Sequence, residues 1–498
     1  MIKKDECIRA LNDMIASAAV VGDTDESKSF QESSAIFIKK TLNNYEKARS
    51  LVDDINQHIS RPFNKDYFIK KITEIRNMVA SLDSWNDDSN ILTEEMEKYI
   101  VEQLVVEEII GDIKELGDGK SGAVIHLIKV ICKDYAKSGH YIVKSFDTEK
   151  VTGTAANEVR TSQSIYENSP DDFRDNHLVR PQHSDTINDE HIMKKVMIFD
   201  YATDDLLGST ALCKLKNTAN HSKYIEAISY DLLKKWNAVP TQSREQNDFF
   251  TSLLINRLGP DERFEEGAKK VLDYPDRPWV STRNGTYPNP FYYIKSTSDF
   301  DWFNSKGMYK GRIHGDFHGD NIICIDTDKE MDMKYRIIDY SHFKNDGYLL
   351  YDHAYLEIDR YLHIYGKIKG WEKWENDMKK LVETSFQNKC EESITLIALA
   401  MRNSICNGIK KWATEKHLEK QVSNIEMQLA LARVAAGIKF FCHANKKEDE
   451  YDEEKKKDDE EKKKNLFLYV AICLNRVFKL SHYSGHENNI GVATIKTD

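Results

Sequence analysis

The sequence is poor in the features that mark disulfide-bonded, zinc-binding and membrane-spanning proteins. Its 8 cysteines lie singly between Cys7 and Cys473, and no C-x-x-C pair occurs. This spacing indicates neither a zinc site nor a disulfide framework. No run approaches the roughly 18 apolar residues that a transmembrane helix needs. The first seven residues include acids where a secretory signal would have only bases. We therefore expect a cytoplasmic protein that does not contact a membrane.

Excess positive charge is also absent. The chain of 498 residues has a formal net charge of −11. An acidic chain is not expected to bind nucleic acid over its surface, although a local basic cleft could still hold phosphates. The length allows two or three domains with a sizeable core.

Proline is absent from the last part of the chain, because all 9 prolines lie before residue 291. Long uninterrupted helices are therefore expected there, and Ser393–Ala413 and Gln421–His443 carry helical apolar patterns. We predict a mostly helical region over residues 204–498. Within it, the mixed-charge run at 446–464 is either a solvated helix extension or a disordered loop. Apolar character returns after the run, so it is interpreted as an insertion.

The first 110 residues also have a helical pattern. Apolar side chains recur at three- and four-residue steps over Ser33–Ile59 and Asp66–Leu82, and a third helix is expected over Thr93–Ile110. We expect a helical bundle packed onto the rest of the chain. The alternatives are an independent catalytic unit and a module that binds a partner protein.

The pattern changes between residues 111 and 203. β-Branched residues over Ala123–Ile131, Tyr141–Phe146 and Lys195–Phe199 predict strands, and Thr154–Glu167 predicts a helix. The glycines Gly117, Gly119 and Gly122 form a turn between strands. That context favours a hairpin covering nucleotide phosphates over a dinucleotide-binding motif. We therefore expect an α+β protein with a β-rich lobe before the helical region.

The residues that indicate chemistry follow Gly311. His314, Asp316 and Asn321 lie in the segment His-Gly-Asp-Phe-His-Gly-Asp-Asn, and an apolar run ends at Asp339. Phosphoryl transfer needs one carboxylate to orient the attacking hydroxyl, and a carboxamide and a second carboxylate to bind magnesium. Asp316 would take the first role, and Asn321 and Asp339 the second. The alternative for this segment is a polar loop between strands. Asp320, in the same loop, is either a further ligand of the metal or substrate or a solvent-facing acid.

Two upstream residues complete the pattern. Lys144, on an expected strand, would contact nucleotide phosphates, and Glu158, on an expected helix, would hold it. Taken alone, Lys144 is more typical of an exposed strand lysine, and Glu158 of a solvated helix acid. The downstream motif favours the nucleotide-site roles for both residues.

These motifs resemble those of the aminoglycoside phosphotransferases and choline kinases over residues 111–365. Those enzymes have His-Gly-Asp in the catalytic loop and an Asp-ending metal-binding strand, here Ile-Ile-Asp339. The segment Gly347–Glu357 resembles their Asp-Leu-Ala segment, which implies that Asp352 buttresses the loop. His318 matches their second histidine, a structural residue. The segment is also similar to the kinase-like ternary-complex-associated domains of bacterial conflict systems.

The resemblance implies a bilobal protein-kinase-like fold that uses ATP or GTP with magnesium. The interval from 203 to 311 is typical of small-molecule kinases, and roughly a dozen residues separate Asp339 from Asp352, too few for a long peptide-docking loop. We therefore expect the acceptor to be a hydroxyl of a small molecule. Protein phosphorylation, nucleotidyl transfer and a pseudokinase that only binds nucleotide remain alternatives.

Overall fold

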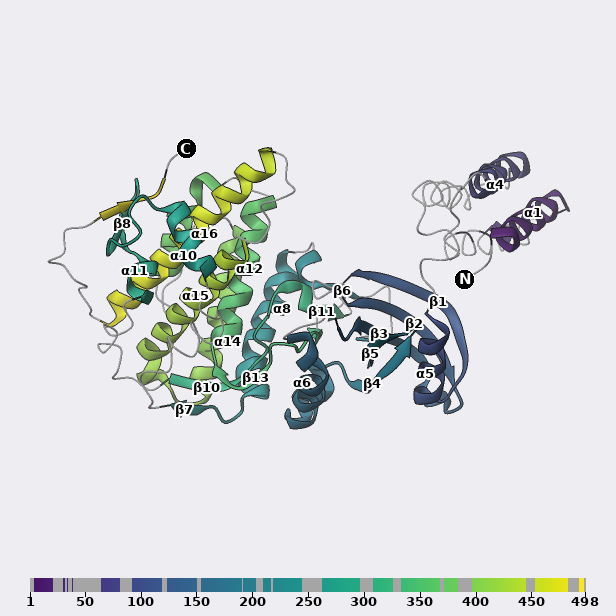
Figure 1. Cartoon of the computed structure of the whole chain (residues 1–498), viewed down its shortest axis with the longest axis horizontal. Helices are drawn as coiled ribbons and strands as arrows, with labels where there is room; N and C mark the ends of the chain where they lie inside the picture. The colour runs from purple at the N-terminus through teal and green to yellow at the C-terminus, as the bar shows by residue number, and fades with distance from the viewer. Residues whose placement is uncertain are drawn as a thin grey trace. The chain divides into compact units, whose positions relative to one another are not determined.

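The computed structural model divides the chain into two compact units. The first comprises residues 1–151 and 182–200, and the second comprises 152–181 and 201–498 (Figure 1). The structure describes residues 4–20, 30–31, 34, 38, 64–80, 92–118, 123–149, 154–189, 191–202, 209–215, 218–243, 262–295, 308–325, 333–367, 371–383, 396–444, 453–481 and 492–496. Most of the expected helix Ser33–Ile59, together with Gly119 and Gly122, lies outside these residues.

The first unit is built on a five-stranded sheet of order β1-β2-β3-β5-β4. Its strands are β1 (Val106–Asp118), β2 (Val124–Cys132), β3 (Gly139–Asp147), β4 (Pro181–Asp189) and β5 (Ile192–Asp200). The pairs β1–β2, β2–β3 and β3–β5 are antiparallel. The three strands expected from β-branched runs are therefore confirmed, as β2, β3 and β5.

Helix α5 (Glu94–Leu104) covers one face of this sheet (Figure 1). Thr93 caps the helix by accepting a hydrogen bond from the Met96 N–H. Acidic residues occupy its first turn, where negative charge interacts favourably with the helix dipole. The expected helix Thr93–Ile110 was too long, because Val105 takes a left-handed conformation with φ 52° and β1 starts at Val106. The β-branched and apolar residues after Val105 pair with β2 instead of continuing the helix.

The pleat of β3 places Lys144 on the face away from α5. Val143 packs in the cluster that α5 covers, and successive side chains of a strand point to opposite faces. Lys144 pairs with Ile125 of β2 and Met197 of β5, and its side chain is buried. It is therefore not the exposed strand lysine of the alternative interpretation.

Two N-terminal helices, α1 (Lys4–Val20) and α4 (Lys65–Ala80), pack on each other through an apolar cluster of their own. The cluster includes Leu11, Phe68 and Ile72, which are nearly inaccessible to solvent. The expected helix Asp66–Leu82 is confirmed as α4. Binding of a partner protein by this region stays a prediction.

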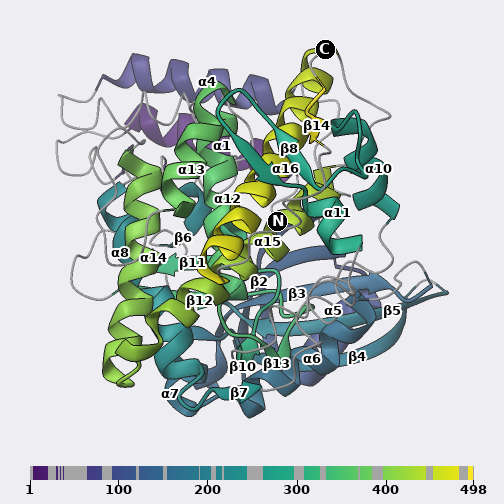
Figure 2. The same cartoon turned by 90° about the vertical axis from the view of Figure 1, so that its left-hand side faces the viewer.

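The second unit is mostly helical and holds the largest core. Its helices are α6 (Thr154–Asn168), α7 (Asp171–His177), α8 (Thr218–Asp231), α10 (Glu262–Val271), α11 (Pro290–Lys295), α12 (Tyr351–Lys367), α13 (Trp374–Glu383), α14 (Leu396–Glu415), α15 (Val422–Ala444) and α16 (Glu453–Ser481). Helix α15 packs on α12 and α16, and α14 packs on α8 (Figures 1 and 2). Arg433 of α15 anchors α12 through two hydrogen bonds of 2.7 and 2.9 Å to the buried Glu357.

Several sequence expectations for this unit are confirmed. The two long helices expected around residues 393–443 are α14 and α15, and Thr154–Glu167 is α6. Residues 453–464 of the charged run are the first turns of α16, so for this part the helix extension was the right alternative. The sequence grouping of 111–203 as one lobe differs from the structural division, in which residues 152–181 pack within the second unit.

Short strands connect the helices. They form three sheets of three strands, β13-β10-β7, β12-β11-β6 and β14-β8-β9. The members are β6 (Ser209–Ala211), β7 (Thr241–Ser243), β8 (Trp279–Ser281), β9 (Thr286–Pro288), β10 (Met308–Ile313), β11 (Ile322–Ile325), β12 (Lys334–Ile337), β13 (Lys344–Tyr348) and β14 (Val492–Thr494). A helical unit preceded by a β-rich unit confirms the expected α+β class. No helix within the described ranges is long and apolar enough to cross a lipid bilayer.

Candidate active site

The candidate catalytic loop joins β10 to β11 within the second unit. It begins at His314, immediately after β10, and ends with a short 3-10 turn, Gly319–Asn321, that leads into β11. Its first turn requires a glycine, since Gly315 has a φ of 84°. Both ends of the loop are thus fixed by strands, which suits a site that must hold reacting groups in place.

Asp352 holds the start of this loop. It lies in the first turn of α12, and its carboxylate accepts hydrogen bonds from the backbone N–H groups of His314 (2.6 Å) and Gly315 (2.9 Å). The side chain is 2% exposed, so both bonds are shielded from water. These two bonds tie the start of the loop to α12, and a role of Asp352 in supporting catalysis stays a prediction.

His314 connects the loop to the segment after β12. Its Nε2 lies 2.9 Å from the carbonyl oxygen of Ile338, and its Nδ1 accepts a 3.3 Å hydrogen bond from the Asp316 N–H. The ring therefore carries its proton on Nε2 and donates it to Ile338. His314 is fully buried and has a structural role between the two segments that carry Asp316 and Asp339.

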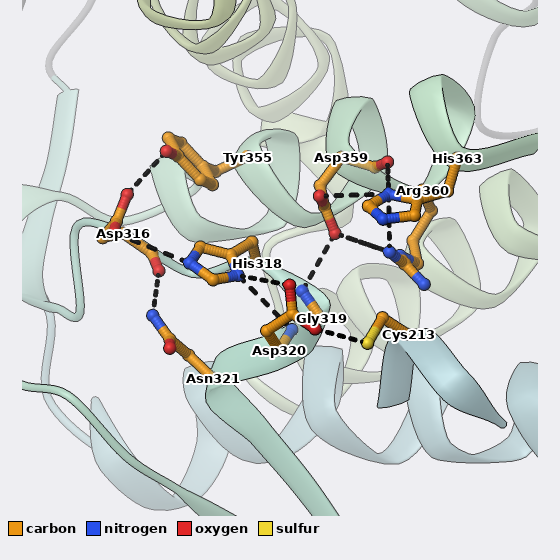
Figure 3. Close-up of polar contacts among 10 residues, drawn as sticks. All are labelled: Cys213, Asp316, His318, Gly319, Asp320, Asn321, Tyr355, Asp359, Arg360 and His363. Carbon is orange, nitrogen blue, oxygen red and sulfur yellow. Dashed lines mark hydrogen bonds and ion pairs between the residues drawn. The ribbon is translucent and has the colours of Figure 1, made fainter. Parts of the chain in front are cut away.

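The Asp316 carboxylate has a hydrogen-bond partner on one of its two oxygens. The Tyr355 hydroxyl donates a 2.6 Å hydrogen bond to Asp316 Oδ1, and His318 Nε2 lies 3.7 Å from Oδ2 (Figure 3). Burial raises the pKa of Asp316, but the Tyr355 hydrogen bond and the nearby His318 outweigh it, so the pKa lies below the usual value. The group is therefore ionised at neutral pH.

Asn321 and Asp339 flank the same end of the β11–β12 hairpin, one just before β11 and the other two residues after β12. Ile322 pairs with Ile337, and the Ile338 N–H donates a 3.0 Å hydrogen bond to the Asn321 carbonyl oxygen. The Asn321 side-chain nitrogen donates to the Asp316 carbonyl oxygen at 2.9 Å (Figure 3). With the nitrogen engaged, the side-chain oxygen of Asn321 is the atom that can coordinate a cation.

Asp339 lies two residues beyond β12 and has an unusual backbone conformation. Its φ is 61°, a left-handed value that aspartate and asparagine tolerate better than most residues. Its Oδ1 accepts a 2.8 Å hydrogen bond from the Ser341 hydroxyl. The turn directs the chain away from the hairpin immediately after the carboxylate.

The donor set fits magnesium. Carboxylate and carboxamide oxygens are hard ligands, and magnesium in phosphotransferases needs only one or two protein ligands besides substrate phosphates. Over the described part of the chain, no group of three or more His, Cys, Asp and Glu side chains is arranged to hold a metal ion. Asn321 and Asp339 carry oxygen donors of the kind that magnesium takes, and their binding of a cation shared with a nucleotide stays a prediction.

The second half of the loop is held by Asp359 of α12. Its Oδ2 accepts a 2.9 Å hydrogen bond from the Gly319 N–H and lies 2.9 Å from an Arg360 guanidinium nitrogen (Figure 3). His363 Nδ1 lies 3.4 Å from Asp359 Oδ1. Burial raises the pKa of Asp359, but these neighbours hold it below its usual range. The carboxylate is thus a permanent acceptor for the loop.

Asp320 and His318 complete the loop. The Cys213 thiol lies 2.6 Å from Asp320 Oδ1, and the Asp320 N–H donates a 3.3 Å bond to His318 Nδ1. Burial, followed by the Asp320 hydrogen bond, raises the pKa of Cys213 to about 12, so the thiol remains protonated and donates. The Asp320 side chain is half exposed. Asp320 therefore contacts Cys213 through its side chain, and His318 accepts a hydrogen bond from within the loop.

Comparison with known proteins gives structural but not sequence matches. No protein-family model matches the chain, and no curated protein matches it in sequence. A Ralstonia eutropha protein assigned to the aminoglycoside phosphotransferases matches with a TM-score of 0.37 and 10% identity, covering 76% of this chain and 98% of that chain. The ethanolamine kinase of Plasmodium vivax matches with a TM-score of 0.35 and 10% identity, covering 93% and 94%.

The upstream residues lie in different units. Lys144 belongs to β3 of the first unit and Glu158 to α6 of the second, and both side chains are buried. Gly117 lies in β1, next to the end of that strand. The nucleotide-binding roles of these three residues stay predictions.

Sequence reasoning missed Tyr355, Asp359 and Cys213. A signal existed for the first two, because they follow Asp352 by three and seven positions, the spacing of one helix face. No spacing rule pointed to Cys213, which is more than a hundred residues from Asp320 in the chain.

Proposed function

We propose that this protein is a magnesium-dependent phosphotransferase that moves the γ-phosphoryl group of ATP or GTP to a hydroxyl group of a small molecule. The observation that carries the proposal is the loop itself. An ionised Asp316, fixed by Tyr355, is linked through Asn321 to the hairpin end that bears Asp339. A carboxylate beside a hard-cation site is the constellation that phosphoryl transfer requires.

Asp316 acts on the acceptor hydroxyl. Its carboxylate orients the O–H group and takes the proton as the acceptor oxygen bonds to the γ-phosphorus. The bond between the γ-phosphorus and the bridging oxygen breaks, and a nucleoside diphosphate leaves with that electron pair. The low pKa of Asp316 makes it a weak base, which suits a step in which the proton moves late and positioning matters most.

Asn321 and Asp339 would hold magnesium, which neutralises charge on the nucleotide phosphates. Lys144 would contact those phosphates and Glu158 would hold Lys144, with the turn containing Gly117, Gly119 and Gly122 covering them. These residues bind and orient the nucleotide and leave the proton transfer to Asp316.

The segment between Asp339 and Asp352 favours a small acceptor. It contains a short turn, then β13, which pairs with β10, and then the start of α12. Residues 333–367 are described without a gap, so the whole connection is accounted for. It is built into a sheet and a helix, which leaves no long segment on which a substrate peptide could dock.

The test is nucleotide turnover by the purified protein. ATP and GTP are offered with magnesium and a panel of sugars, amino alcohols, aminoglycosides, nucleosides and proteins, and phosphorylated products are detected by mass spectrometry. Transfer to a small hydroxyl compound is the expected result. Nucleotide binding without turnover of any acceptor would favour the pseudokinase alternative, and transfer only to proteins would contradict the proposed acceptor class.

A further inference from the structure

Tyr355 forms a hydrogen bond to one carboxylate oxygen of Asp316 in the candidate site. It lies on α12 between Asp352 and Asp359, and its hydroxyl donates a 2.6 Å hydrogen bond to Asp316 Oδ1 (Figure 3). The side chain is 3% exposed, and its ring packs against Phe440 of α15 with centroids 4.7 Å apart. A side chain this deeply buried has little surface with which to touch a substrate directly.

We propose that Tyr355 is a positioning residue for phosphoryl transfer, which fixes the Asp316 carboxylate so that Oδ2 is the oxygen that receives the acceptor proton. The inference rests on the proposed function and deepens it. Oδ1 is committed to the Tyr355 hydroxyl. Within the described part of the chain, Oδ2 has His318 Nε2 as a neighbour at 3.7 Å, which is beyond hydrogen-bond distance.

The need for such a residue follows from the torsion of an aspartate side chain. Rotation about the Cβ–Cγ bond is broad and roughly two-fold, so an unanchored carboxylate samples many orientations. Asn321 restrains Asp316 through its backbone carbonyl and leaves that rotation untouched. The Tyr355 hydrogen bond restrains the carboxylate itself, and a hydroxyl bonded to a carboxylate at this distance is one of the stronger hydrogen bonds in proteins.

The first arm of the test is kinetic. Tyr355→Phe removes the hydroxyl and keeps the ring against Phe440. The turnover number should fall about tenfold while the KM for the nucleotide is unchanged, because only the orientation of the reacting groups is lost. Tyr361→Phe is the matched control. Tyr361 lies on the same helix and is buried, but its hydroxyl bonds to Glu357, so this variant should keep the wild-type turnover number.

The second arm needs no substrate. The Tm is measured for the wild type, Tyr355→Phe, Asp316→Ala and the double variant. Tyr355→Phe should lower the Tm of the wild type and cause no further loss in the Asp316→Ala background, because the hydroxyl then has no carboxylate to hold. Equal losses in both backgrounds would overturn the inference.

The two arms separate this inference from the proposed function. A loss of turnover with a raised nucleotide KM, or an unchanged turnover number, would overturn the positioning role of Tyr355. If the wild type turns over no nucleotide, the proposed function fails, and the Tm measurements decide alone whether Tyr355 holds the Asp316 carboxylate. A coupled Tm effect would then support that contact, and an uncoupled one would overturn it.

Discussion

Asp352 Oδ2 accepts a hydrogen bond of 2.6 Å from the backbone N–H of His314. This contact fixes the start of the candidate catalytic loop against the first turn of α12, where a negative charge also interacts favourably with the helix dipole. The same carboxylate binds the next N–H group, so the charged form of Asp352 satisfies two buried donors. Hydrogen bonds to charged groups contribute about 1.5–3 kcal/mol each, which makes the contact important for both fold and site.

Asp352→Asn is therefore expected to damage the site although the shape of the side chain is retained. A carboxamide nitrogen would face one of the two loop N–H groups, leaving a buried donor unpaired. We expect nucleotide turnover to fall by tenfold or more, with a lower Tm. Asp346→Asn, at an exposed position on β13, is the matched control and should change neither quantity. An Asp352→Asn variant with the activity and Tm of the wild type would contradict this role.

Asp339→Asn should separate metal binding from folding. Asparagine tolerates the left-handed conformation that Asp339 adopts, so the turn after β12 should be kept. A neutral carboxamide binds a divalent cation more weakly than a carboxylate does, and the substitution leaves Asn321 and residue 339 with no negative charge for the cation, so magnesium-dependent turnover should be abolished. Circular dichroism and Tm check the fold, and calorimetric titration with ATP, with and without magnesium, checks the site. Wild-type turnover in a folded variant would refute the metal assignment.

Gly319→Ala should disrupt the loop by contact alone. A Cβ at this position would lie 2.9 Å from Cζ of Arg360 and 3.1 Å from the backbone nitrogen of Cys213. Arg360 is buried and paired with Asp359, and a backbone atom cannot move away cheaply. We expect a lower Tm and a loss of turnover. Gly139→Ala is the control, since its Cβ would have no heavy atom within 4 Å and should leave turnover unchanged. Equal effects of the two substitutions would contradict the steric account.

Much of this arrangement could be predicted from the sequence, because it depends on local patterns. Runs of β-branched residues located β2, β3 and β5, and helical patterns located α6, α14 and α15. The spacing of His314, Asp316, Asn321 and Asp339 located the loop and the hairpin end. These features depend on residues close in sequence. A pattern of that kind survives even where no sequence relative is recognised.

The features that the sequence did not predict have a common physical reason: they depend on contacts between distant segments. The helix expected over Thr93–Ile110 stops at Leu104 because the following residues pair with β2. Cys213 meets Asp320 only because two distant segments fold together. Tyr355 and Asp359 lay on a helix face already marked by Asp352, so a search along α12 at helical spacing would have found them.

The pair Lys144 and Glu158 is the prediction that extends furthest beyond the described contacts. If Lys144 binds nucleotide phosphates and Glu158 holds it, Lys144→Ala should weaken ATP binding strongly, because a charge-assisted contact is lost. Glu158→Ala should act through the same contact, so the double variant should be barely worse than Lys144→Ala alone. Calorimetric ATP titration of the four proteins measures this. Additive losses would show that the two residues do not work as one unit.

The most direct measurement for the whole account compares Asp316→Ala with the wild type in nucleotide turnover and nucleotide affinity. The account predicts a turnover number lower by on the order of a hundredfold or more, because the group that positions the attacking hydroxyl is lost. The Kd for ATP with magnesium should be nearly unchanged, because the proposed role of Asp316 is toward the acceptor hydroxyl and not toward the nucleotide. A collapse of nucleotide affinity with surviving turnover of bound substrate would make Asp316 a binding residue and contradict the account.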